Sequence, residues 1–151
     1  MFLVPYKRMV ITSSQEDNII INRLKDIVEP NVYWFKHPPK EKEFVGNISS
    51  TSFYMTRNII GRNTYLPWLH LRLFKLSNGT NINIVMTLHP VAVIAMLCFT
   101  ASGLYLSIKY NDYKGCLFIL GMMILFHTVM YFTGFLPEVR WAEKRLREIA
   151  A

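Results

Sequence analysis

Four histidines are the residues of this chain best suited to hold a metal ion or to move a proton: His37, His70, His89 and His127. In the hairpin that the sequence predicts for residues 69–88, His70 and His89 fall on one polar face as diagonal neighbours, about 7–8 Å apart at the backbone. They could share a metal ion if a third ligand, such as His37, came from elsewhere. Neither a CxxC nor an HExxH pattern accompanies them. We therefore interpret His70 as a solvated strand residue and His89 as an interfacial one, with metal binding as the alternative.

His127 lies in the apolar stretch "MMILFHTVMYF". An ionisable side chain among so many apolar ones needs a polar partner, and such residues often have a function. No acidic residue accompanies it in residues 90–108 or 115–136, so a proton relay has no second member. We expect a neutral imidazole bonded to Thr100, Ser102 or a backbone carbonyl of the facing helix.

The sequence favours no other site chemistry. GxSxG and glycine-rich phosphate loops are absent, and both cysteines, Cys98 and Cys116, fall within apolar runs. We expect neither enzymatic activity nor a cofactor. The net charge of +7 suits an anionic lipid surface, and no nucleic-acid-binding motif accompanies it.

Two apolar runs dominate the second half of the chain. Hydrophobic residues make up 52% of the sequence although 18% of it is charged, and residues 90–108 and 115–136 carry no charge at all. About 20 helical residues cross the hydrocarbon core of a bilayer. We therefore predict two transmembrane helices, with buried core helices of a soluble protein as the alternative. Gly103 and Ser107 permit close helix packing, within the hairpin or in a dimer.

The charges beside these runs predict the topology. The connector carries Lys109 and Lys114, whereas the tail after residue 136 carries four basic residues: Arg140, Lys144, Arg145 and Arg147. Cytoplasmic segments are richer in Lys and Arg than external ones. Both termini are therefore expected in the cytoplasm and the connector outside.

The first half of the chain reads as a small sheet with one helix. Strands are predicted at residues 6–14, 31–36, 43–49 and 52–60, and a helix at residues 14–30, capped by Ser13 or Ser14 and stopped by Pro30. Asn78-Gly79 is a preferred pair for a two-residue type I′ turn, which would place Ser77 opposite Thr80. The same register places these apolar residues opposite each other: Leu73 and Ile84, Leu71 and Met86, Leu69 and Leu88.

His89 and Pro90 join this hairpin to the first apolar run. Proline lacks the N–H that a strand would use and fits the first turn of a helix, so the dipeptide is interpreted as a structural junction. Pro137 likewise predicts the start of a tail helix, whose apolar side chains recur at helical spacing: Val139, Ala142, Leu146 and Ile149. This amphipathic helix would lie on the membrane surface or on the soluble domain. The predicted fold class is thus α+β, with a mostly antiparallel cytosolic domain (residues 1–88), a two-span hairpin (89–136) and a tail helix (137–151).

Residues 43–90 carry a series of short motifs: F-x-G, F-x-x-x-R, R-N-x-x-L-P and L-H-P. This segment resembles a group of small bacterial membrane proteins of uncharacterised function that share these motifs ahead of two spans. The matching positions are Phe44, Gly46, Phe53, Arg57, Arg62, Asn63, Leu66, Pro67, Gly79, Thr80, Leu88, His89 and Pro90. The resemblance implies a bacterial inner-membrane protein with a cytosolic β-rich domain, and it implies no activity.

These expectations favour a non-enzymatic, membrane-anchored interaction or accessory protein. Its sheet domain would bind a protein partner or a second copy of the chain at the cytoplasmic face of the membrane, in contact with lipid. One alternative is a sensor or carrier of a small apolar or amphiphilic ligand at that surface. Another is an immunity-type protein that protects the inner membrane from a toxin.

Overall fold

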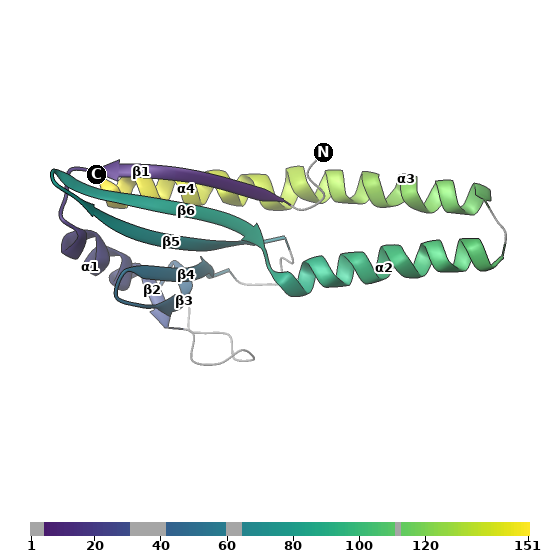
Figure 1. Ribbon diagram of the computed structural model, residues 1–151, viewed down its shortest axis with the longest axis horizontal. Helices are drawn as coiled ribbons and strands as arrows, with labels where there is room; N and C mark the ends of the chain where they lie inside the picture. Colours follow the sequence, from purple (N-terminus) through teal and green to yellow (C-terminus); the bar gives the residue numbers. More distant parts are fainter. Residues whose placement is uncertain (1–4, 31–41, 60–64, 111–112) are drawn as a thin grey trace.

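The computed structural model describes residues 5–30, 42–59, 65–110 and 113–151. Its centre is a six-stranded sheet in the order β1-β6-β5-β4-β3-β2, antiparallel except for the β2–β3 pair. Two long helices, α2 and α3, extend side by side from one end of this sheet (Figure 1). The expected α+β class with a mostly antiparallel sheet is confirmed. The elements are β1 (Tyr6–Ser13), α1 (Asp17–Ile27), β2 (Val28–Pro30), β3 (Phe44–Ile48), β4 (Ser52–Arg57), β5 (Pro67–Leu76), β6 (Gly79–Leu88), α2 (Pro90–Lys109), α3 (Tyr113–Met130), η1 (Tyr131–Phe135) and α4 (Leu136–Ala150).

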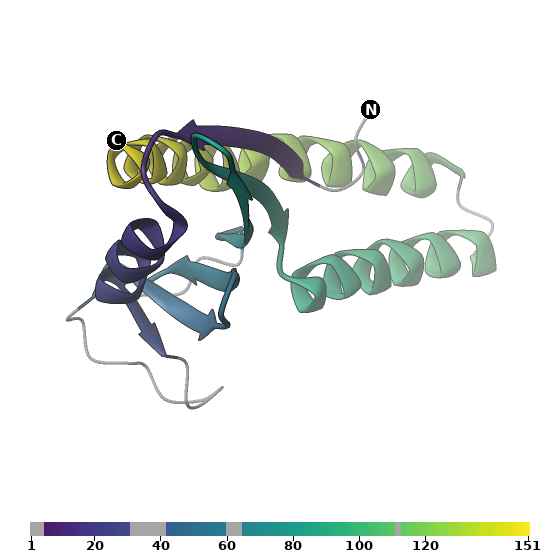
Figure 2. The ribbon, with the colours of Figure 1, turned by 60° about the vertical axis from the view of Figure 1, so that its left-hand side comes forward.

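Side chains alternate between two faces of the sheet, as the pleat of a strand requires. The face that we call the inner face is covered by α1 and α4 (Figure 2). It carries Ile11, Phe44, Phe53, Met55, Leu69, Leu71, Leu73, Ile82, Ile84, Met86 and Leu88. Ile20 and Leu24 of α1 and four apolar residues of α4 complete this core: Val139, Ala142, Leu146 and Ile149. The apolar stripe predicted for the tail therefore packs on the sheet, one of the two locations that the sequence allowed.

The register of the β5–β6 hairpin differs from the prediction by two residues. Leu76 pairs with Gly79, so Ser77 and Asn78 form the turn rather than Asn78 and Gly79. Leu69 consequently faces Met86 instead of Leu88. A shift of two residues keeps every side chain on its predicted face, so the hydrophobic pattern fits both registers equally well. Gly79 has φ +132°, and a Cβ there would lie 2.0 Å from the Ser13 carbonyl oxygen of β1. The close approach of β1 thus requires glycine as the first residue of β6.

The first helix is shorter than predicted. It begins after Glu16, which makes no side-chain cap, and it ends at Ile27, where Val28–Pro30 continue as strand β2. The Ser13 hydroxyl instead accepts a hydrogen bond from the Gln15 backbone N–H, so the predicted serine cap is wrong. The strand expected at residues 31–36 lies outside the described residues.

The two apolar runs form α2 and α3, which are long and apolar enough to cross a membrane by length and composition. Only 11% and 6% of their most apolar stretches are buried inside the molecule. Apolar side chains along both helices are therefore exposed, including Leu97, Phe99, Leu117 and Phe118. Core helices of a soluble domain would be covered by the rest of that domain. These two helices are not covered within the monomer.

The second apolar helix and the tail form one helical rod of 38 residues, Tyr113–Ala150. Helix α4 begins at Leu136 with Pro137 in its first turn, close to the predicted start, but it continues α3 and η1 without a break. In a continuous α-helix, Pro137 would remove one backbone hydrogen bond and its ring would strain the preceding turn. The π-helical segment Tyr131–Phe135 precedes it directly, where the Leu136 N–H donates to the Tyr131 carbonyl. This wider turn lets the helix pass from the apolar span to the sheet without ending.

Candidate functional site

The histidine pair proposed as a metal site does not form. Because the register differs from the predicted one, His70 pairs with Val85, and the ring of Trp68 lies between His70 and His89, which follows β6. His37, the suggested third ligand, lies outside the described residues. Within the described ranges, no group of three His, Cys, Asp or Glu side chains could hold a metal ion. The diagonal-neighbour prediction is therefore wrong.

The two histidines instead lie at the ends of a row of four rings, on the sheet face opposite α1 and α4. His70 lies 4.2 Å from Tyr54, Tyr54 stacks on Trp68 at 4.5 Å, and Trp68 lies 5.2 Å from His89, measured between ring centroids. Burial, and then the charge of Arg72, lower the pKa of His70, while burial raises the pKa of Tyr54. At neutral pH the His70 and Tyr54 side chains are consequently uncharged members of this aromatic row.

We call the sheet face that carries this row the outer face. It consists of Tyr6, Arg8, Val10 and Thr12 on β1; Asn81, Asn83, Val85 and Thr87 on β6; Trp68, His70, Arg72, Phe74 and Leu76 on β5; Ser52, Tyr54 and Thr56 on β4; Val45 and Asn47 on β3; and Glu29 on β2. The acidic residue of this set, Glu29, lies on the edge strand, three strands away from β5. Arg8 and Arg72 are exposed and make no ion pair with any described residue. The outer face therefore combines aromatic and aliphatic side chains with two free guanidinium groups.

His89 and Pro90 lie where the sheet meets α2. His89 has extended backbone angles, and its Nδ1 accepts a hydrogen bond from the Val91 N–H at 3.2 Å, while Pro90 is the first helical residue. The imidazole thus satisfies one of the free N–H groups at the helix start. With Trp68 against its ring, His89 fixes the direction in which the chain leaves β6.

His127 finds its polar partner in the sheet domain. Its Nδ1 is hydrogen-bonded to the Tyr65 hydroxyl at 3.1 Å, and that hydroxyl donates to Met96 Sδ of α2 at 3.4 Å. Tyr65 is only 4% exposed and lies edge-on to Phe126. The partners expected from α2 are engaged elsewhere, since Thr100 and Ser102 donate to the carbonyls of Met96 and Cys98 in their own helix. A side chain of the β4–β5 connection therefore joins α2 to α3.

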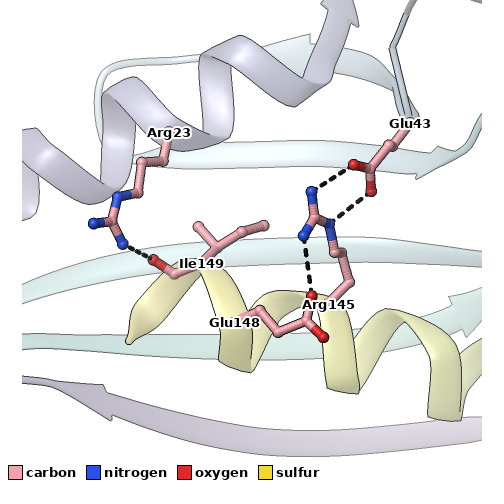
Figure 3. Close-up of polar contacts among 5 residues, drawn as sticks. All are labelled: Arg23, Glu43, Arg145, Glu148 and Ile149. Atoms are coloured by element: carbon pink, nitrogen blue, oxygen red, sulfur yellow. Dashed lines mark hydrogen bonds and ion pairs between the residues drawn. The ribbon is translucent and has the colours of Figure 1, made fainter.

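Ion pairs fasten α4 to the sheet along its length. Arg145 donates from Nε and Nη2 to the two carboxylate oxygens of Glu43, at 2.8 and 2.5 Å, and from Nη1 to Glu148 at 3.0 Å (Figure 3). Arg23 of α1 donates to the Ile149 carbonyl at 2.9 Å near the end of the same helix (Figure 3). These contacts hold α1, β3 and α4 together on the inner side.

The other two carboxylates of α4, Glu143 and Glu138, pair with residues of β1 and β4 and within the helix. Glu143 pairs with Lys7 of β1 and with Arg147. Glu138 pairs with Arg57 of β4, whose guanidinium also lies 3.9 Å from the centre of the Trp141 ring. Every acidic residue of α4 is thus neutralised, and the helix is bound to β1 on one side and to β3 and β4 on the other.

Among the described residues, the side chains considered above form surfaces that could bind a partner, and we find no grouped nucleophile, base and acid that could act in catalysis. Cys98 and Cys116 are unpaired and lie on different helices. Sequence reasoning identified His89, Pro90 and His127 but missed Tyr65 and the arginines of the outer face. Comparisons with protein-family models, with curated proteins and with solved structures find no match to this chain.

Proposed function

We propose that this chain is a non-enzymatic, membrane-anchored interaction protein whose α2 and α3 cross the bilayer and whose sheet domain binds a protein at the cytoplasmic surface. The observation that carries the proposal is the continuity of Tyr113–Ala150, which is bare and apolar in its first part and fills the inner face of the sheet with its last part. Anchor and domain are therefore one rigid unit.

The polar groups of the two helices support a place in lipid. The hydroxyls of Thr100, Ser102, Thr128 and Thr133 each donate to the backbone carbonyl four residues earlier in their own helix. Side chains that bond to their own helix need no water. Exposed Tyr105, Tyr110 and Tyr113 mark one end of the pair, where tyrosine would meet the interface.

The orientation follows from the basic residues. Lys109 and Lys114 lie at the far end of the helices, and four basic residues of α4 lie on the sheet side: Arg140, Lys144, Arg145 and Arg147. This distribution supports cytoplasmic termini in a bacterial inner membrane. Membership in the group of small bacterial membrane proteins described above belongs to the same proposal.

The topology is tested with reporters fused after Ala151 and within residues 110–113. We expect a cytoplasmic signal from the first reporter and an external signal from the second, with the protein resisting extraction from membranes by alkaline carbonate. A C-terminus outside the cell, or release by carbonate, would overturn the membrane part of the proposal.

The interaction role is tested on the chain isolated from its own membrane in mild detergent after chemical cross-linking. We expect a defined protein, or a second copy, in a fixed stoichiometry with the chain. Recovery as a monomer at every cross-linker concentration would argue against this role, as would turnover of a substrate by the purified chain.

A further inference from the structure

We propose that the outer face binds an acidic segment of a partner protein, with Arg8 and Arg72 contacting its carboxylates. This inference rests on the proposed function and assigns the binding surface and the chemistry of the partner. The two arginines flank β6, because Arg8 pairs with Val85 and Arg72 pairs with Asn83 on its opposite sides. Neighbouring strands are about 4.8 Å apart, so a segment lying along β6 can reach both guanidinium groups.

Exposed apolar side chains gather on the same face. Away from α2, α3 and their connections, the exposed large hydrophobic side chains in the described residues are Tyr6, Val10, Ile19, Phe74 and Leu76. All except Ile19 belong to the outer face. Interfaces between proteins favour aromatic residues and arginine, and these supply much of the binding energy. The composition of this face therefore suits a protein interface.

The charge balance indicates an acidic partner. On the inner side, Lys7, Arg57, Arg145 and Arg147 are neutralised by the carboxylates of Glu43, Glu138, Glu143 and Glu148. On the outer face, Arg8 and Arg72 make no ion pair with any described residue, and the carboxylate on that face, Glu29, lies on the edge strand β2, three strands away from β5. A guanidinium group binds a carboxylate through two parallel hydrogen bonds. The face is therefore complementary to carboxylates brought by another chain.

The same observations disfavour other occupants. The rings of Tyr54 and Trp68 stack on each other, so the faces that they share are not open to nucleic-acid bases. Arg72 lies five residues beyond Pro67, about 17 Å along β5 from its start next to the apolar helices, which is beyond the lipid headgroups. Two copies related by a twofold axis at β6 would oppose arginine with arginine. An acidic protein segment fits best.

The test uses the full chain in nanodiscs of uncharged phosphatidylcholine and a fluorescent peptide of alternating glutamate and valine. The charge-reversal variant is Arg8→Glu with Arg72→Glu. The matched control is Arg140→Glu with Lys144→Glu, which changes the net charge equally on exposed α4 residues that make no ion pair. We expect the first variant to weaken peptide binding roughly tenfold or more and the control to leave it within about twofold. A milder pair, Arg8→Gln with Arg72→Gln, should weaken binding in the same direction and guards against misfolding of the reversed variant.

Equal loss in both charge-reversed variants would overturn the inference, because binding would then follow net charge alone. It would also be overturned by tighter binding of oligouridylate, or of phosphatidylglycerol vesicles, at the same arginines. The cross-linked partner of the preceding section separates the two proposals. If the Arg8→Glu, Arg72→Glu variant retained that partner, the assignment of the outer face would be wrong and the interaction role would stand. If the native chain had no partner, the interaction role itself would be wrong.

Discussion

The hydroxyl of Tyr65 lies 3.1 Å from Nδ1 of His127, and this hydrogen bond connects the loop before β5 to the last turn of α3. Tyr65 also reaches Met96 on α2, so one buried phenol contacts both apolar helices. Burial raises the pKa of Tyr65, which keeps the phenol protonated and able to donate. The sheet domain is thereby fixed to the helices at a third point, besides the direct continuations at Pro90 and Leu136.

Replacement of Tyr65 by phenylalanine should loosen this connection. The ring would keep its packing against Phe126, but the hydrogen bond to His127 would be lost, at a cost of about 1 kcal/mol in the free energy of unfolding. Thermal unfolding in detergent, followed by tryptophan fluorescence, measures the effect. Tyr105→Phe is the control, since Tyr105 is exposed on α2 and makes no described side-chain hydrogen bond. Equal stability of the Tyr65→Phe variant and the native chain would show that the contact does not stabilise the junction.

Gly79→Ala should be far more harmful than its size suggests. Its φ of +132° is strained for any residue with a Cβ, and the added carbon would meet the Ser13 carbonyl oxygen at 2.0 Å. We expect a loss of about 2 kcal/mol or more in the free energy of unfolding. Gly121→Ala in α3 is the matched control, because a Cβ there meets nothing within 4 Å and alanine favours a helix. Urea unfolding monitors both variants, and comparable stability of the two would contradict the tight packing of β1 against the turn.

The hairpin shows how far the sequence determines the fold. Alternation of apolar and polar residues fixed which side of β5 and β6 faces the core, and that part of the prediction is confirmed. The alternation repeats every two residues, so it cannot distinguish registers that differ by two. The choice depends on Gly79 passing under the Ser13 carbonyl of β1, a contact between segments that lie far apart in the chain. No local turn preference contains that information.

The site was less predictable than the fold for a related reason. The sequence indicates that His127 requires a partner, but Tyr65 is one of many tyrosines and precedes it by 62 positions. The pairing exists only because the loop before β5 reaches the helices. Pro137 likewise predicts a helix start from local chemistry, whereas packing of Val139 and Leu146 on the sheet holds the rod in line through the π-helical segment.

The Glu43–Arg145 pair should contribute a measurable coupling energy. Its side chains are 37% and 34% exposed, so solvent screens the pair in part, and we expect about 1 kcal/mol from its two-point geometry. The hydrogen bond to the Glu43 carboxylate, which has the largest effect, and the one to Glu148 raise the pKa of Arg145. Its charge therefore persists at all accessible pH values. A double-mutant cycle of Glu43→Gln and Arg145→Gln, with unfolding measured at low and high salt, gives this energy. A cycle of Arg145→Gln with Glu148→Gln should give a smaller value; a coupling near zero for Glu43 would mean that apolar packing alone holds α4 on β3.

Acid should weaken the attachment of α4 to β1 through Glu143. Hydrogen bonds from Lys7, and next from Arg147, lower the pKa of this carboxyl below 4.5 in the folded chain. In the unfolded chain the pKa returns to its ordinary value, so the unfolded state binds the proton more readily. The stabilisation from Glu143 is therefore complete above about pH 4.5 and is lost as the pH falls through the lower, folded value. We expect the free energy of unfolding of Glu143→Gln to depend less steeply on pH than that of the native chain as the pH falls below about 4.5.

Lys7→Met provides the matched test of the cause. It removes the first and largest contribution to the lowered pKa while retaining Arg147, so the acid-induced loss should be smaller than in the native chain and larger than in Glu143→Gln. Urea unfolding of the three proteins at a series of pH values measures the order. Because Lys7 is in β1 and Glu143 is in α4, hydrogen exchange of the β1 amides should increase over the same pH range. If the three proteins lost stability in parallel, the acid sensitivity would have to arise from the other carboxylates of the inner side, and Glu143 would not couple β1 to the helical rod.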